Sequence, residues 1–175
     1  MAARRRALLV TGAPGAGKTT ALRSVAARLG DARLGGFYTE EIRHRGVRTG
    51  FRLVTFDGRQ ALLASVHRPG APRVGKYGVD VAALDTVVKS ALAPRGVDVH
   101  VVDEIGKMEC LSPRFVSAMR ALLDRGRPCV ATIARRGAGF IAEVKRRPDV
   151  EVWELNRSNR DDMPGRIVAW LGEVA

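Results

Sequence analysis

The chain has 175 residues, of which 46% are hydrophobic, and its 30 Lys and Arg against 18 Asp and Glu give a formal net charge of +12. This size predicts one domain over residues 1–175. The sequence has no apolar stretch long enough to span a membrane, and the apolar run behind the first basic residues is too short for a secretory signal. We therefore expect a cytoplasmic protein that makes no membrane contact. The charge permits nucleic-acid binding, but the basic groups are scattered and lack interleaved aromatic residues, so we favour a solvated surface that attracts nucleotide phosphates.

Strands and helices alternate along most of the chain. Short apolar runs are typical of buried parallel strands, and three extended runs separated by turn signals predict a small antiparallel meander. The pattern predicts an α/β fold whose mostly parallel sheet is covered by helices on both faces. The expected elements are a strand over 7–11, a helix over 19–29, the meander over 36–65, a helix over 81–92, a strand over 97–103, a helix beginning at Ser112-Pro113, a strand over 129–134, a helix around 140–144, a strand over 150–155 and a last helix around 167–171.

The segment between the first strand and the first helix has the spacing of a phosphate-binding loop, Gly12-x-x-x-x-Gly17-Lys18-Thr19. Glycines let successive backbone N–H groups curl around an anion, and the helix that follows points its positive end at the phosphates. Lys18 adds charge for the β- and γ-phosphates, while the Thr19 hydroxyl is a ligand for Mg²⁺. The residues assigned to nucleotide binding here are Gly12, Ala13, Pro14, Gly15, Ala16, Gly17, Lys18, Thr19 and Thr20.

The strand expected at 97–103 ends in the acidic pair Asp103-Glu104, at the sheet edge where α/β proteins place ligand chemistry. We expect Asp103 to hold Mg²⁺ together with Thr19. Glu104 is expected to polarise a water molecule for attack on the γ-phosphate, the general-base role that hydrolysis requires. The alternative is a strand-end pair that caps the following turn.

Other basic residues are candidates for contact with the substrate. Lys107 lies three residues after Glu104 and is either a catalytic cation facing the transferred phosphate or a solvated lysine. Arg48 and Lys76 are weaker candidates for the same role, with surface charge favoured. Asn159-Arg160 lies between the last strand and the last helix, where an amide and a guanidinium can contact a base, or where the loop only caps the helix.

Several segments together resemble the thermophile nucleoside-triphosphatase family called THEP-one, whose relatives include the cancer-related nucleoside-triphosphatase. The matching segments follow in the family's order over nearly the whole chain, and they are TGAPGAGKTT, GFYTEEIR, RTGFRLVT, VGKYGVDV, VVDEIGKMEC, ATIARRGAGFIAEVKRR and NRDD. The resemblance implies a cytoplasmic P-loop protein with a RecA-like sheet. It also implies slow, Mg²⁺-dependent hydrolysis of ATP, GTP and the other nucleoside triphosphates, CTP and UTP among them, to the diphosphate.

Two other functions stay open. The same residues serve a phosphotransferase that passes phosphate to a nucleotide or to a 5′-hydroxyl end of RNA or DNA, since kinases and hydrolases differ mainly in which nucleophile is held in line. The basic charge also permits a nucleotide-dependent RNA-binding switch. The ABC-transporter signature LSGGQ is absent, which argues against an ABC-type dimer. We expect a monomer, and we expect the isolated Cys110 and Cys129 to be reduced core residues.

Overall fold

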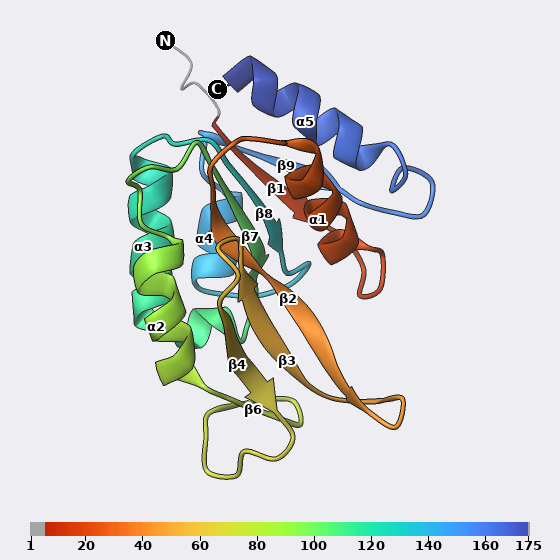
Figure 1. Cartoon of the computed structure of the whole chain (residues 1–175), viewed down its shortest axis with the longest axis vertical. Coiled ribbons are helices and arrows are strands. Elements are labelled where there is room, and N and C mark those ends of the chain that lie inside the picture. The colour runs from red at the N-terminus through yellow and green to blue at the C-terminus, as the bar shows by residue number, and fades with distance from the viewer. Residues whose placement is uncertain (1–5, 175) are drawn as a thin grey trace.

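The computed structural model describes residues 6–174, in which helices pack on both faces of a central sheet (Figure 1). Residues 1–5, the beginning of the segment that we excluded as a secretory signal, lie outside the described part of the chain. Within the described residues the sheet has nine strands in the order β5-β6-β4-β3-β2-β7-β8-β1-β9. The strands are β1 (Ala7–Thr11), β2 (Leu34–His44), β3 (Val47–Thr55), β4 (Gln60–Ser65), β5 (Arg73–Val74), β6 (Tyr77–Val79), β7 (Val99–Ile105), β8 (Cys129–Ile133) and β9 (Val150–Glu154).

Parallel pairing links the strands that precede the expected site. β1 pairs in parallel with β8 and β9, and β7 pairs in parallel with β2 and β8. β8 therefore lies between β1 and β7, as in a RecA-like sheet. Leu8 and Val10 pack into one core cluster and Ala7 and Leu9 into the other, because helices cover both faces of β1 and leave no polar side to the strand.

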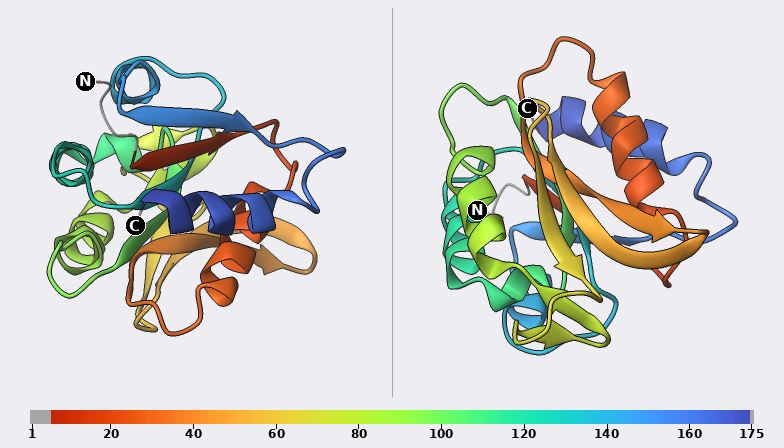
Figure 2. Two further views of the ribbon diagram at one scale, coloured as in Figure 1. Left: turned by 90° about the horizontal axis from the view of Figure 1, so that it is seen from above. Right: turned by 60° about the horizontal axis from the view of Figure 1, so that its bottom comes forward.

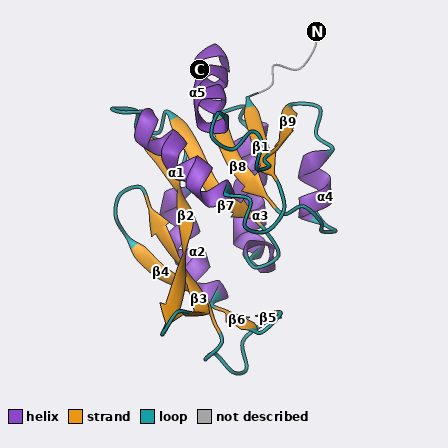
Figure 3. Cartoon of the chain, turned by 90° about the vertical axis from the view of Figure 1, so that its right-hand side faces the viewer, coloured by secondary structure: helices purple, strands orange, loops and turns teal. Residues whose placement is uncertain are grey.

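The helices form one layer on each face of the sheet. Figures 2 and 3 show α1 and α5 on one face and α2, α3 and α4 on the other, which agrees with the two separate core clusters. Among the described residues no helix is both long enough and apolar enough to span a bilayer. The helices are α1 (Lys18–Arg28), α2 (Val81–Ala91), α3 (Pro113–Asp124), α4 (Phe140–Lys145) and α5 (Met163–Val174), and a short 3₁₀ turn covers Glu109–Leu111.

The predicted meander is confirmed, and it is continuous with the main sheet. The beginning of β2 pairs in parallel with β7, whereas the rest of this long strand pairs antiparallel with β3, which in turn pairs with β4. The small hairpin of β5 and β6 extends the same edge of the sheet. One sheet therefore runs from the phosphate loop to the meander, so that residues of β2, β3 and β4 reach the candidate site.

Some boundaries and burial assignments differ from the prediction. The strand expected at 97–103 runs from Val99 to Ile105, so Asp103 and Glu104 lie within it. The last strand was expected to be buried, but β9 lies at the sheet edge and Val152 is 41% exposed, because β1 is its neighbour on one side and water on the other. Cys129 is buried, Cys110 is half-buried and both are free, as expected.

Candidate active site

The loop after β1 has the geometry of a phosphate cradle. A side chain at Gly12 would place its Cβ 2.5 Å from the carbonyl oxygen of Leu155, so only glycine allows the loop to pack against the end of β9. Gly17 has φ +103°, in the left-handed region that favours glycine, directly before α1 begins at Lys18. The Lys18 ammonium donates a hydrogen bond of 3.0 Å to the Gly12 carbonyl and thus spans the loop. Backbone donors, a helix N-terminus and a cation therefore converge on one site.

Asp103 is the best-connected side chain of the site. The residue is 2% exposed, and its carboxylate accepts hydrogen bonds from the hydroxyls of Thr19 at 2.7 Å, Thr39 at 2.8 Å and Thr132 at 2.6 Å. The backbone N–H of Thr39 donates to it as well, at 3.2 Å. Residues from α1, β2 and β8 thus fix one carboxylate at the end of β7.

The oxygen atoms of Thr19 and Asp103 are suitable ligands for Mg²⁺. The Thr19 hydroxyl directs its proton to Asp103, which leaves the lone pairs of its oxygen free for a cation. Carboxylate and hydroxyl oxygens beside a phosphate cradle are the hard ligands that Mg²⁺ takes, with phosphate oxygens and water completing the shell. Thr19 and Asp103, the two residues predicted to hold the metal, therefore lie in contact and carry the right chemistry.

Two further carboxylates lie beside Asp103. A Cβ built at Gly106 would lie 2.7 Å from a Glu104 carboxylate oxygen and 2.8 Å from one of Glu109, so both groups approach the same point. Burial raises the pKa of Glu104, an effect that the charge of Lys18 opposes and that of Asp103 reinforces. Burial and the nearby Glu104 raise the pKa of Glu109 to about 8. At neutral pH the pair therefore holds a proton on Glu109.

A pocket of about 850 Å³ joins these groups. It begins at the phosphate loop and the first turn of α1, passes the end of β7, and continues over β3, β4 and β5. Its lining residues are Pro14, Gly15, Gly17, Lys18, Thr19, Thr20, Arg23, Thr39, Glu40, Glu41, Arg48, Phe51, Leu63, Val74, Asp103, Glu104, Lys107, Met108, Glu109 and Ala134.

The weaker basic candidates divide between the pocket and the surface. Lys107 and Arg48 line the pocket, Lys107 as an exposed side chain and Arg48 in a network of polar contacts. Lys76 is not among the lining residues, and its ammonium lies 5.5 Å from the centre of the Tyr77 ring. The structure therefore brings two of the three candidates to the site.

Asn159 and Arg160 lie in the loop after β9, outside the pocket lining. The Asn159 amide donates to the Glu154 carbonyl at 2.8 Å and accepts from the Asn156 N–H at 2.8 Å, so both of its ends bind the backbone of its own loop. Arg160 is exposed, with Asp161 3.8 Å away. Because Leu155 packs on Gly12, this loop does adjoin the phosphate loop, and contact with a base stays a prediction.

Sequence reasoning missed three residues that shape the site. Thr39 and Thr132 fix the Asp103 carboxylate, which is expected to bind the metal, and Glu109 lies against the expected general base. Thr132 had a usable signal, since it is the one threonine in the otherwise apolar segment 129–134. Thr39 and Glu109 stand among other polar residues, where spacing alone does not single them out.

Comparison with known proteins agrees with this geometry. A model of the NTPase family matches residues 7–168, which is most of the chain. The chain belongs to the NTPase family. Nucleoside-triphosphatase THEP1 of Thermotoga sp. (strain RQ2) is 40% identical to it over 166 residues, covering 94% of each chain. A cancer-related nucleoside-triphosphatase homolog of Mus musculus is 36% identical, covering 94% of this chain and 95% of its own.

The fold also agrees with that of a solved structure from the NTPase family. The crystal structure of THEP1 from the hyperthermophile Aquifex aeolicus superimposes with a TM-score of 0.82 at 35% identity, over 94% of this chain and 98% of the other. The resemblance inferred from the sequence motifs is therefore confirmed, and with it the α/β fold. As a member of the NTPase family the chain is an enzyme.

Proposed function

We propose that this protein hydrolyses nucleoside triphosphates to the diphosphate and phosphate in a slow, Mg²⁺-dependent reaction with broad base tolerance. The observation that carries this proposal is the meeting of the phosphate loop with Asp103 and Glu104 in one pocket, through the 2.7 Å hydrogen bond from Thr19 to Asp103. The names of the relatives, nucleoside-triphosphatases, support the same substrate class.

Binding of the triphosphate falls to the loop and the first turn of α1. Backbone N–H groups of residues 12–19 surround the phosphates, and Lys18 moves its ammonium from the Gly12 carbonyl to the β- and γ-phosphates. Thr19 and Asp103 would hold Mg²⁺, which would supply positive charge to offset that of the phosphates. The three threonine contacts keep the Asp103 carboxylate in one orientation during turnover.

Glu104 acts on the attacking water. A bond forms from the water oxygen to the γ-phosphorus, the bond to the bridging oxygen breaks, and the proton of the water passes to the Glu104 carboxylate. Burial favours this transfer because it raises the pKa of that carboxyl and makes it a stronger base. Glu104 also lies close enough to Lys18 for the lysine charge to limit this rise, so the group stays available as a carboxylate.

Slow turnover and broad base tolerance follow from side chains that the site does not hold against the substrate. Lys107, the candidate cation for the transferred phosphate, is exposed and makes no hydrogen bond or ion pair with the described residues. Both ends of the Asn159 amide already bind backbone groups, so this amide has little capacity left to bind the polar edge of a base. Strong discrimination between bases needs buried polar groups that match one base edge. We place the activity in a cytoplasmic monomer, and the two free thiols suit such a reducing compartment.

Replacement of Lys18 by alanine tests this proposal. We expect Lys18→Ala to bind ATP with Mg²⁺ at least tenfold more weakly and to lose measurable phosphate release, since the loop loses the charge that reaches the phosphates. Lys89→Ala, which removes an exposed lysine from the last turn of α2, is the matched control and keeps the parent rate. Phosphate release by Lys18→Ala at the parent rate would overturn the proposal.

A further inference from the structure

The pocket extends well beyond the groups that hydrolysis requires. One part carries the phosphate loop, Asp103 and Glu104. The other part, which we call the distal half, is formed by Arg48, Phe51, Leu63, Val74, Lys107 and Met108. A water molecule attacking the γ-phosphate needs no apolar chamber, so the distal half is not explained by the proposed reaction.

We expect the base of a bound nucleotide on the opposite side of the phosphate loop, near Asn159 and Arg160. β9 and the loop after it flank β1 on one side, where Leu155 packs on Gly12. β7, β2, β3 and β4 lie on the other side of β1, and the distal half is built on β3, β4 and β5. Glu104, the residue assigned to the γ-phosphate, lies on that same side. The distal half therefore lies beyond the position expected for the γ-phosphate, on the side away from the position expected for the base.

Two acidic residues beside the distal half, Glu40 and Glu41, form ion pairs with arginines. Glu41 forms ion pairs with Arg43 and Arg48, and Glu40 pairs with Arg52 at 2.7 Å. These groups therefore do not repel an anion from the distal half.

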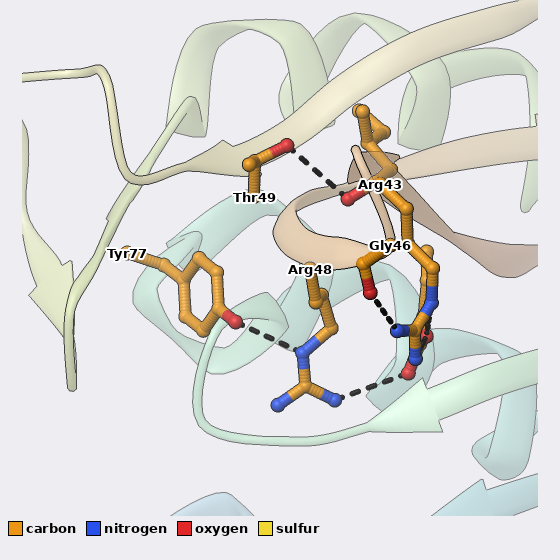
Figure 4. A network of polar contacts seen from close by, with 7 residues as sticks. Arg43, Gly46, Arg48, Thr49 and Tyr77 are labelled. Carbon is orange, nitrogen blue, oxygen red and sulfur yellow. Dashed lines mark hydrogen bonds and ion pairs between the residues drawn. The ribbon is translucent and has the colours of Figure 1, made fainter.

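Two cations remain for such an anion. Arg48 is held in place on two sides. Its Nε donates to the Tyr77 hydroxyl (Figure 4), a bond of 2.9 Å, and one terminal nitrogen donates to Glu41 at 3.1 Å. Its other terminal nitrogen has no hydrogen bond or ion pair to the described residues. Lys107 likewise has no partner in the part of the chain that the structure describes. A fixed guanidinium with a free N–H₂ group is suited to binding a carboxylate, sulfonate or phosphate.

The floor of the distal half is apolar and aromatic. Leu63 is 1% exposed, while Phe51, Val74 and Met108 are half-buried and line the pocket. Phe51 packs edge-on against Tyr77, with ring centres 5.1 Å apart, and the Arg48 guanidinium lies 5.1 Å from the Phe51 ring centre. Flat apolar groups pack well on such a surface beside a cation.

We propose that the distal half binds a second small molecule beside the triphosphate, a flat aromatic ring that carries one anionic group. The ring lies on Phe51, Leu63 and Met108, and the anion binds Arg48 and Lys107. The inference rests on the proposed function only in that the triphosphate occupies the phosphate loop and leaves the distal half free.

Naphthalene-1-sulfonate is the probe, because it combines a flat apolar ring with a single anion. Calorimetric titration of the full chain is expected to show one saturable site, both alone and with a saturating non-hydrolysable ATP analogue and Mg²⁺. Methanesulfonate lacks the ring and 1-naphthalenemethanol lacks the anion, and each is expected to bind at least tenfold more weakly. Equal binding of the probe and either of these compounds contradicts the proposed recognition.

Two variants assign the probe to this half of the pocket. Arg48→Gln should weaken binding about tenfold or more, through loss of a charge-assisted hydrogen bond, and Phe51→Leu should weaken it severalfold while keeping an apolar side chain. Arg59→Gln, which removes another exposed arginine paired with a carboxylate, is the control and should not change it. Urea unfolding of each variant verifies that it is folded.

Displacement of the probe by the ATP analogue would mean that the nucleotide itself fills the distal half, and equal affinities in Arg48→Gln and Arg59→Gln would place the probe elsewhere. Either result overturns the inference. The analogue is titrated separately, so failure of the proposed function, seen as no nucleotide binding, is distinguished from failure of the second site.

Discussion

Replacement of Glu109 by glutamine should remove a pH dependence of stability that the parent protein has. Glu109 is 4% exposed, and burial, with a further contribution from Glu104, raises its pKa from 4.5 to about 8. Between these values the folded state binds a proton that the unfolded state has lost. The free energy of unfolding therefore falls as pH rises through this window and levels off above about pH 8.

The size of the effect follows from the shift. One pH unit within the window is worth about 1.4 kcal/mol, so between about pH 5.5 and 7.5 Glu109 should lower the free energy of unfolding by roughly 2–3 kcal/mol. His100 acts with the opposite sign, because burial lowers its pKa, and Glu104 with the same sign. Both residues are present in parent and variant alike. The difference in stability between the parent and Glu109→Gln is therefore the quantity to follow.

Urea unfolding at the two pH values measures this difference. We expect Glu109→Gln to gain stability relative to the parent by roughly 2–3 kcal/mol between the lower and the higher pH. Glu143→Gln is the control: Glu143 is exposed and paired with Arg120, which lowers its pKa, so it is ionised in both states across this window. If the parent and Glu109→Gln changed in parallel with pH, Glu109 would not be the buried protonated acid described here.

Two further substitutions test the local geometry. Gly12→Ala would bring a methyl group 2.5 Å from the Leu155 carbonyl oxygen and should weaken nucleotide binding, measured by titration, by more than tenfold. Gly172→Ala is the control, because a methyl group there meets no atom within 4 Å and should leave the affinity unchanged. Equal affinities of the two variants would contradict the packing of Gly12 on Leu155. Ser112→Ala removes the cap of α3, a 2.9 Å bond from the Phe115 N–H, together with the hydrogen bond that the Ser112 hydroxyl donates to Asp85. It should lower the free energy of unfolding in urea by about 1–2 kcal/mol, whereas Ser117→Ala, exposed on the same helix, should change it little. A loss as small as that of Ser117→Ala would rule out the cap.

Local spacing explains why the phosphate loop and its helix were predictable. The contact of Thr19 with Asp103 was predictable as well, although 84 positions separate the two residues, because parallel strands bring their carboxyl ends to one edge of the sheet. The start of α3 at Pro113 followed from a cap that needs only adjacent residues. Such features depend on short-range chemistry or on a general rule of sheet topology.

Other features depend on packing between distant segments, which spacing does not encode. Glu109 faces Glu104 only because Gly106 has no side chain between them. The segment 150–155 carries Glu151 and Glu154, a sign of a partly exposed strand that the prediction of a buried strand did not use, and its place at the sheet edge follows from the pairing of β9 with β1. The distal half of the pocket gathers Phe51, Leu63 and Met108 from separate parts of the chain, so it became visible only in the structure.

The fate of the γ-phosphate tests the central claim most directly. The assay follows γ-labelled ATP with Mg²⁺, in the presence of nucleoside monophosphates and 5′-hydroxyl oligonucleotides as competing acceptors, for the parent, Glu104→Gln and the exposed control Glu173→Gln. We expect the label to appear in free phosphate. Glu104→Gln should release phosphate about two to four orders of magnitude more slowly than the parent protein while it keeps the parent's nucleotide affinity, and Glu173→Gln should release it at the parent rate. Parental turnover by Glu104→Gln, or label passing to an acceptor faster than free phosphate is released, would contradict a hydrolase that uses Glu104 as its base.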